Sequence, residues 1–119
     1  MQKKYMKKNL GNIVIMYKIK NTSAEYLIDN GFKELNNGAF LLRFPISFYK
    51  RTPTLFCKAI IYPENGKRVM IEVEKTSGIP YGPWYDTECD QLSKRFRKEL
   101  NDNIHKKMNK VGARHYEDK

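Results

Sequence analysis

An apolar stripe in the last third of the chain most constrains its fold. Side chains recur there at spacings of three or four residues, which places them on one face of an α-helix. Asp86 is a residue type that caps helix starts, and Gly112 is one that ends helices. The pattern predicts one long amphipathic helix between them, which needs a second layer to cover its apolar face. The stripe consists of Cys89, Leu92, Phe96, Leu100, Ile104, Met108 and Val111.

Two Asn-Gly pairs predict the β-hairpins of that second layer. Asn37-Gly38 and Asn65-Gly66 can each form a two-residue type I′ turn, because Asn and Gly tolerate positive φ. The first turn would join residues 32–36 to residues 39–46. Pro45 indicates that this second strand ends there or lies at a sheet edge, since proline cannot donate a ladder hydrogen bond.

The second hairpin would pair residues 55–62 with residues 68–75. In that register Tyr62 opposes Val69 and Ile60 opposes Ile71. The opposite face would carry Arg68, Met70, Glu72 and Glu74. The predicted core face comprises Phe56, Ile60, Tyr62, Val69, Ile71 and Val73.

The N-terminal part predicts a strand and a short helix. Isoleucines and a tyrosine alternate with other residues over 12–20, which is the period of a half-buried strand. Thr22 or Ser23 can cap a helix of about two turns that Asn30-Gly31 ends. The predicted fold class is therefore α+β, an antiparallel sheet of about four to five strands with a short N-terminal helix and the long C-terminal helix packed on one face. We expect a flexible basic arm at 1–11, one domain at 12–112 and a polar tail at 113–119.

The net charge of +10 lies at the two ends of the chain. Residues 1–20 hold six lysines and no acid, and residues 94–119 hold nine basic and four acidic residues. This distribution indicates an acidic partner, although surface charge also keeps small proteins soluble. No apolar run approaches the roughly 20 residues that cross a bilayer, so we expect a cytoplasmic protein without membrane contact.

The cysteines and histidines predict no metal site and no cofactor. Cys57 and Cys89 lie in apolar patterns and are expected to be buried, reduced thiols. His105 and His115 do not complete the ligand spacing of a zinc site with them.

Basic residues of the arm and the final helix form the first candidate site. They would contact phosphates without reading base sequence. The alternative is a solvated helix face whose acids at the start and bases at the end complement the helix dipole. The candidates are Lys3, Lys4, Lys7, Lys8, Lys94, Arg95, Arg97, Lys98, Lys106 and Lys107.

A helix followed by strands and a final helix resembles the order of elements in a double-stranded RNA-binding domain. In that family, lysines at the start of the last helix grip phosphates. Asp86, Glu88 and Asp90 occupy the matching turn here and would repel phosphates. The chain is therefore not assigned to that family.

Two aromatic segments are further candidates. Tyr81, Trp84 and Tyr85 lie in a loop with two prolines and could anchor a protein partner, or they could close the open end of the core. Residues 49–51, Tyr-Lys-Arg, lie between the middle strands and form a small basic and aromatic site.

Catalytic patterns fail on their spacing. A metal-dependent nuclease would need an acid and, on the next strand, a second acid two residues before a lysine. Glu64 and Glu72 come nearest to this pattern, but Glu64 lies in the predicted hairpin tip and Lys75 comes one position too late. Cys89 and His105 lie sixteen residues apart on one predicted helix, beyond side-chain reach. We therefore expect no enzyme.

Three hypotheses follow from these observations. The first is a non-catalytic accessory protein that binds nucleic acid or a nucleoprotein through the arm and the last helix. The second is a small phage or mobile-element inhibitor, anti-defence or anti-CRISPR-like, that binds a host nucleic-acid-handling protein. The third is a homo-oligomeric structural protein.

Overall fold

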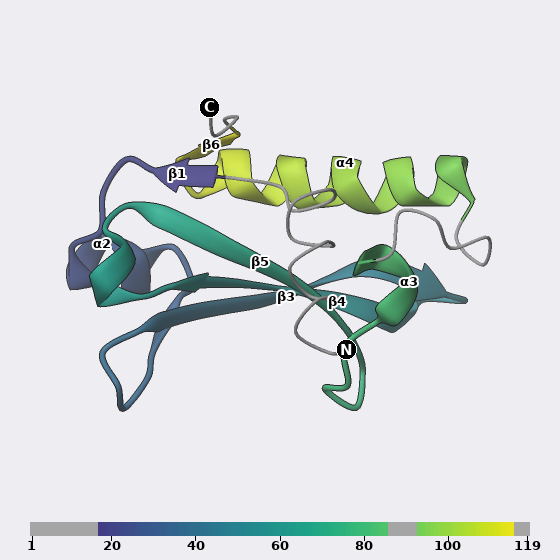
Figure 1. Ribbon diagram of the computed structural model, residues 1–119, viewed down its shortest axis with the longest axis horizontal. Helices are drawn as coiled ribbons and strands as arrows, with labels where there is room; N and C mark the ends of the chain where they lie inside the picture. Colours follow the sequence, from purple (N-terminus) through teal and green to yellow (C-terminus); the bar gives the residue numbers. More distant parts are fainter. Residues whose placement is uncertain (1–16, 86–92, 116–119) are drawn as a thin grey trace, which may run out of the picture.

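The computed structural model describes residues 17–85 and 93–115, which form a six-stranded sheet covered by helices. The strand order is β2-β3-β4-β5-β1-β6, and neighbouring strands are antiparallel (Figure 1). The predicted α+β class, with a final helix on the sheet, is confirmed. The elements are β1 (Tyr17–Ile19), α2 (Ala24–Asp29), β2 (Lys33–Glu34), β3 (Phe40–Tyr49), β4 (Thr52–Ile61), the 3-10 helix η1 (Pro63–Asn65), β5 (Arg68–Lys75), α3 (Gly82–Tyr85), α4 (Lys94–Lys110) and β6 (Ala113–His115).

Helix α4 lies across one face of the sheet, as its apolar stripe predicts (Figure 1). Leu100, Ile104 and Met108 are fully buried, and Val111 continues the stripe just after the helix. Cys89 and Leu92 lie outside the described residues. The sheet supplies the other half of the core, including Ile46, Cys57, Ala59, Val69, Ile71 and Val73.

The predicted start of this helix at Asp86 is wrong. Ser93 is the N-cap of α4, with extended backbone angles and a hydroxyl that accepts a hydrogen bond from the Phe96 N–H at 3.1 Å. Asp86, Glu88 and Asp90 lie outside the described residues and before this cap. The first turn of α4 consequently contains Lys94 and Arg95 and no acid.

The first Asn-Gly turn forms, but not as a type I′ turn. Gly38 has φ +87°, whereas Asn37 has no positive φ. The Gly38 N–H donates to the Leu35 carbonyl at 3.0 Å, and the Leu35 N–H donates to the Ala39 carbonyl at 2.8 Å. A turn followed by one left-handed glycine is the three-residue hairpin with a bulge.

The register predicted for the second hairpin is wrong by one residue. Ile60 pairs with Met70, and Ala59 pairs with Ile71. The cause is the connection: η1 and Gly66 make a loop of six residues instead of a two-residue turn. On β4 the core face is therefore Cys57, Ala59 and Ile61, while Phe56 and Lys58 point to the other face.

The ends of the described chain meet at one edge of the sheet. Ile19 of β1 pairs with Ala113 of β6, so residues 113–115 belong to the sheet and not to the expected polar tail. The predicted strand at 12–20 is described only from Tyr17, and the arm at 1–11 lies outside the described residues. The short helix is confirmed, with Ser23 as the N-cap of α2 and Gly31 at φ +95° after it.

Candidate nucleic-acid interface

A groove of about 280 Å³ runs between β3 and the second half of α4. Aromatic and proline side chains of β3 form one wall, and lysines with one asparagine of α4 form the other. The lining residues are Phe44, Pro45, Phe48, Asn103, Lys106, Lys107 and Lys110.

The groove exists because β3 is an edge strand along most of its length. Strand β2 pairs with β3 at only two positions, of which Leu41 is the later one. Beyond that point no described strand covers this side of β3, which explains how Pro45 is tolerated there. The side chain of Asn103 donates to the Ile46 carbonyl at 2.9 Å and fixes α4 against this edge.

The lysines give the groove a positive charge. Within residues 17–85 and 93–115, no carboxylate lies within ion-pair distance of Lys106, Lys107 or Lys110. The Nζ atom of Lys107 lies 6.0 Å from the centre of the Phe44 ring, a cation beside an aromatic face. The groove can therefore attract an anion while offering it apolar surface.

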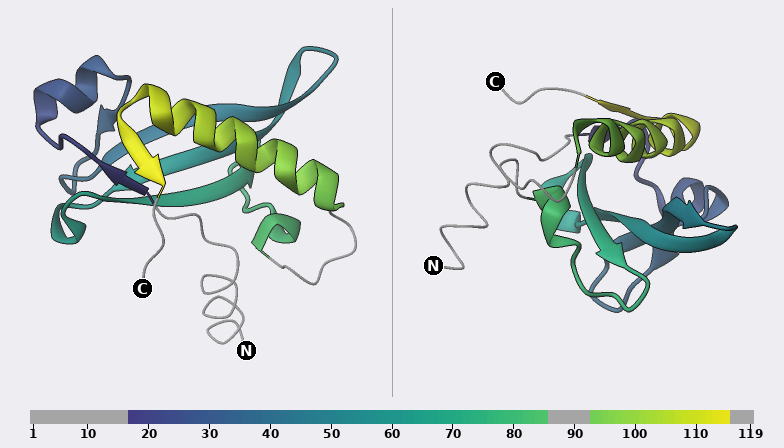
Figure 2. Two further views of the ribbon diagram at one scale, coloured as in Figure 1. Left: turned by 90° about the horizontal axis from the view of Figure 1, so that it is seen from above. Right: turned by 90° about the vertical axis from the view of Figure 1, so that its right-hand side faces the viewer.

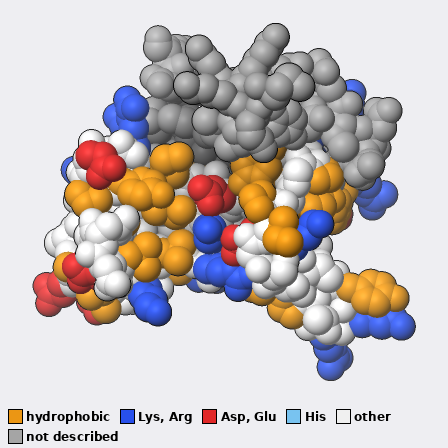
Figure 3. Space-filling model, turned by 60° about the horizontal axis from the view of Figure 1, so that its bottom comes forward, with side chains coloured by type: hydrophobic (Ala, Val, Ile, Leu, Met, Phe, Trp, Pro, Cys, Tyr) orange, Lys and Arg blue, Asp and Glu red, His pale blue; other side chains and the backbone are white. Residues whose placement is uncertain are grey.

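The tip of the β3–β4 hairpin extends this surface. Seen from above, the tip projects beyond the body and diverges from the start of α4 (Figure 2). Phe48 and Tyr49 are 57% and 66% exposed, and Lys50 and Arg51 follow them in an exposed turn. Hydrophobic and basic side chains gather on this projection at the lower right of Figure 3.

The structure separates the predicted basic residues of α4 into distinct groups. Lys106 and Lys107 line the groove, whereas Lys94 and Arg95 are exposed in the first turn at the far end. Lys98 forms an exposed ion pair with Asp102 at 2.8 Å. Lys3, Lys4, Lys7 and Lys8 lie outside the described residues.

Arg97 stabilises the fold locally. Its guanidinium donates to the carbonyl oxygens of Trp84 at 2.6 Å and Pro83 at 2.9 Å. These contacts connect α4 to α3, so this guanidinium serves the packing of the two helices.

The aromatic loop folds inward, in agreement with the alternative that it closes the core. Trp84 is fully buried and Tyr85 is 9% exposed, so neither presents a surface to a protein partner, whereas Tyr81 is partly exposed. The Tyr85 hydroxyl accepts a hydrogen bond from the Val73 N–H at 3.0 Å and so covers a stretch of β5 that β1 does not reach. Burial raises the pKa of Tyr85 to about 12.

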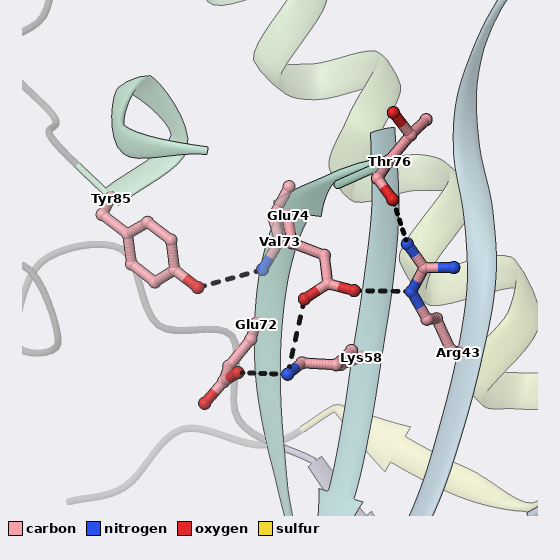
Figure 4. Close-up of polar contacts among 7 residues, drawn as sticks. All are labelled: Arg43, Lys58, Glu72, Val73, Glu74, Thr76 and Tyr85. Atoms are coloured by element: carbon pink, nitrogen blue, oxygen red, sulfur yellow. Dashed lines mark hydrogen bonds and ion pairs between the residues drawn. The ribbon is translucent and has the colours of Figure 1, made fainter. Parts of the chain in front are cut away.

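A neutral ion cluster lies on the sheet face away from α4 (Figure 4). The buried carboxylate of Glu74 contacts Nε of Arg43 at 2.5 Å and Nζ of Lys58 at 3.4 Å, and Lys58 also contacts Glu72 at 3.4 Å. Arg43 additionally lies 3.7 Å from the centre of the Phe56 ring. Because the two cations and two carboxylates compensate one another, this cluster is a structural element and not an anion site.

Sequence reasoning missed the β3 side of the groove. Phe44 and Phe48 were not candidate site residues, because alternation along a strand marks them only as apolar. On the α4 side, Lys110 was interpreted only as a base that complements the helix dipole. The single signal was the Tyr-Lys-Arg sequence at 49–51, which the structure places at the hairpin tip.

An aromatic cluster connects α4 to β1 and β6. The Tyr17 hydroxyl is hydrogen-bonded to Nδ1 of His105, and burial raises the pKa of Tyr17 above its usual value. The rings of His105 and His115 lie 5.1 Å apart. Burial and then the neighbouring His115 lower the pKa of His105, while Asp102 opposes this shift.

We expect this cluster to make stability depend on pH. Because His105 binds a proton less readily in the folded chain than in the unfolded one, the free energy of unfolding should fall as pH drops below about 6.5. The variant His105→Gln should show a shallower decrease between pH 7 and 5 in urea denaturation. Equal slopes for the two proteins would contradict this assignment, and an NMR titration of His105 would measure the pKa directly.

Other site classes find no support in the described part of the chain. Residues 17–85 and 93–115 contain no cluster of three or more His, Cys, Asp or Glu side chains that could hold a metal ion. Cys57 is a buried free thiol, and burial raises its pKa. None of the described helices combines the length and apolar character needed to cross a membrane.

Comparisons with known proteins identify a shared fold. No protein-family model matches the chain, and no curated protein matches it. The crystal structure of a DUF1831 family protein from Lactobacillus plantarum is similar, with a TM-score of 0.56 over 84% of this chain and 86% of that one. The two sequences are 10% identical over this alignment. The chain therefore has the fold of this DUF1831 family protein.

Proposed function

We propose that this chain is a non-catalytic protein that binds nucleic acid through the groove between β3 and α4. The observation that carries the proposal is the row of Lys106, Lys107 and Lys110 along a groove with aromatic residues in its other wall, where no carboxylate of residues 17–85 or 93–115 pairs with these lysines. Phosphates that bind these lysines release condensed counterions, which is the main source of affinity for contacts that do not read sequence.

The corrected start of α4 offers a second place for a phosphate contact, at the other end of the helix from the groove. Lys94 and Arg95 occupy a first turn without acids, where the positive end of the helix dipole disfavours cations. A bound phosphate would offset both charges at once. The acids that argued against phosphate contacts lie before Ser93 and do not belong to this turn.

Salt-dependent binding tests the proposal. A fluorescein-labelled duplex, a single-stranded DNA and a single-stranded RNA would be titrated with the full chain at several salt concentrations, with fluorescence anisotropy as the readout. The variant K106A/K107A/K110A should bind more weakly, and its slope of log affinity against log salt should be shallower by about 2 to 3. The control K33A/K67A/K75A removes the same charge from exposed sites outside the groove. It should keep most of the affinity and most of the salt slope.

Two outcomes would overturn the proposal. One is that no oligonucleotide binds to the unmodified chain. The other is an equal loss for the two triple variants, because this would assign binding to net charge and not to the groove. A partner protein captured in a nuclease-resistant, salt-insensitive complex would favour the inhibitor hypothesis, and a salt-insensitive dimer would favour the oligomer.

A further inference from the structure

The turn at the tip of the β3–β4 hairpin adopts backbone angles that its residue types disfavour. Lys50 and Arg51 have φ values of 48° and 72°, the two central positions of a type I′ turn. Such turns favour Asn and Gly, because a Cβ atom crowds the backbone in the left-handed region. Every other described residue with positive φ is a glycine. Strain of this kind concentrates at functional sites, and both strained residues here carry cationic side chains.

Two exposed aromatic rings precede this turn. Phe48 and Tyr49 are more than half exposed, although each would gain free energy by burial. Nζ of Lys50 lies 5.5 Å from the centre of the Tyr49 ring, so aromatic and cationic groups are interleaved along the tip. Phe48 lines the groove and joins the tip to the groove lysines. Tyr49 is the next residue of β3 and lies on the opposite face of the hairpin, so the two rings flank the tip from its two sides.

The sequence of groups along this surface fits a single strand better than a duplex. Unpaired bases expose flat faces that stack on aromatic rings, and their phosphates follow the same path at a distance that lysines reach. A duplex hides the base faces, so it would contact the lysines and leave both rings exposed to water. A single strand that passes over the tip would use both the rings and the cations beside them, whereas a duplex would use the cations alone.

We propose that the groove and the hairpin tip bind single-stranded nucleic acid, with bases stacked on Phe48 and Tyr49 and phosphates held by Lys50, Arg51 and the groove lysines. This inference rests on the proposed function and adds the class of ligand to it. The cationic side chains bind the phosphate backbone of the strand and provide affinity. The rings provide the preference for unpaired bases.

Removal of the rings tests the inference. A 12-nucleotide oligo(dT) strand should bind more tightly than a 12-base-pair duplex. The variant F48A/Y49A should bind the strand at least about 10-fold more weakly, with an unchanged salt slope and unchanged duplex binding. The control I28A/I79A removes two exposed apolar side chains away from the tip and should bind as the original chain does. Equal affinity for strand and duplex, or no loss in F48A/Y49A, would overturn the inference.

A second variant tests the strained turn itself. K50N/R51G installs the residues that a type I′ turn favours, so it should raise the melting temperature and still weaken binding of oligo(dT). A more stable variant with undiminished binding would show that the side chains of this turn do not belong to the binding site. If duplex and strand bind equally through Lys106, Lys107 and Lys110, only this inference fails; if neither binds, the proposed function fails with it.

Discussion

Replacement of Trp84 by alanine should lower the free energy of unfolding by about 3–5 kcal/mol. The ring is fully buried, and it meets Tyr85 edge-on with ring centres 5.0 Å apart. Its Nε1–H donates to the side chain of Asn101 at 3.0 Å, so the substitution also leaves a partner unsatisfied. A loss of this size is a large part of the stability of a small domain. Urea denaturation followed by far-UV circular dichroism would measure it, since the fluorescence of the single tryptophan disappears in the variant.

The variant Trp84→Phe separates the two contributions. Phenylalanine retains most of the buried apolar area but cannot donate to Asn101, so its loss should be clearly smaller than that of Trp84→Ala. A loss below about 1 kcal/mol for Trp84→Ala would show that α3 can leave the core without consequence for the sheet.

The second large effect is expected at the ion cluster on the sheet face away from α4. Arg43→Met should cost about 2 kcal/mol, because Glu74 then remains buried with only Lys58 as a cation partner. The cost should stay below that of a fully buried pair, since Arg43 is 35% exposed and water screens its charge. The double variant Arg43→Met/Glu74→Leu should recover most of this loss.

A double-mutant cycle in urea provides the measurement. Additive effects of the two single substitutions would show that Arg43 and Glu74 are not coupled. The variant Arg43→Lys serves as a control for the ring contact, because it keeps the charge but loses the planar stacking on Phe56.

Local periodicity predicts the fold class but not the strand register. The stripe of α4 and the alternation in β5 identify buried faces because burial repeats with the period of each element. The position of a turn does not follow from periodicity. Asn65-Gly66 predicted a two-residue turn, whereas η1 and Gly66 make a longer loop. The resulting slip of one residue inverts the exposed face of β4. Composition cannot resolve such a slip, because Ile60 and Ile61 are both buried.

The candidate site was predictable only in part, for a physical reason. The sequence identifies Lys106 and Lys107 as basic residues of a helix. Their position opposite Phe44 and Phe48 in the groove depends on how α4 crosses β3. The Lys50-Arg51 turn carries no turn signal at all, since its residues disfavour the backbone they adopt. The start of α4 was missed because Asp86 and Ser93 are both acceptable caps, and local sequence does not choose between them.

The pairing of β1 with β6 has a consequence for how the chain folds during synthesis. The hairpins of β3, β4 and β5 connect neighbouring segments, so they can form as soon as Lys75 has left the ribosome. Strand β1 must wait until Ala113 of β6 has been made before its second side is paired. The apolar face of the nascent sheet therefore stays uncovered until α4 has been made, and a chaperone that binds exposed apolar surface has its longest opportunity in that interval.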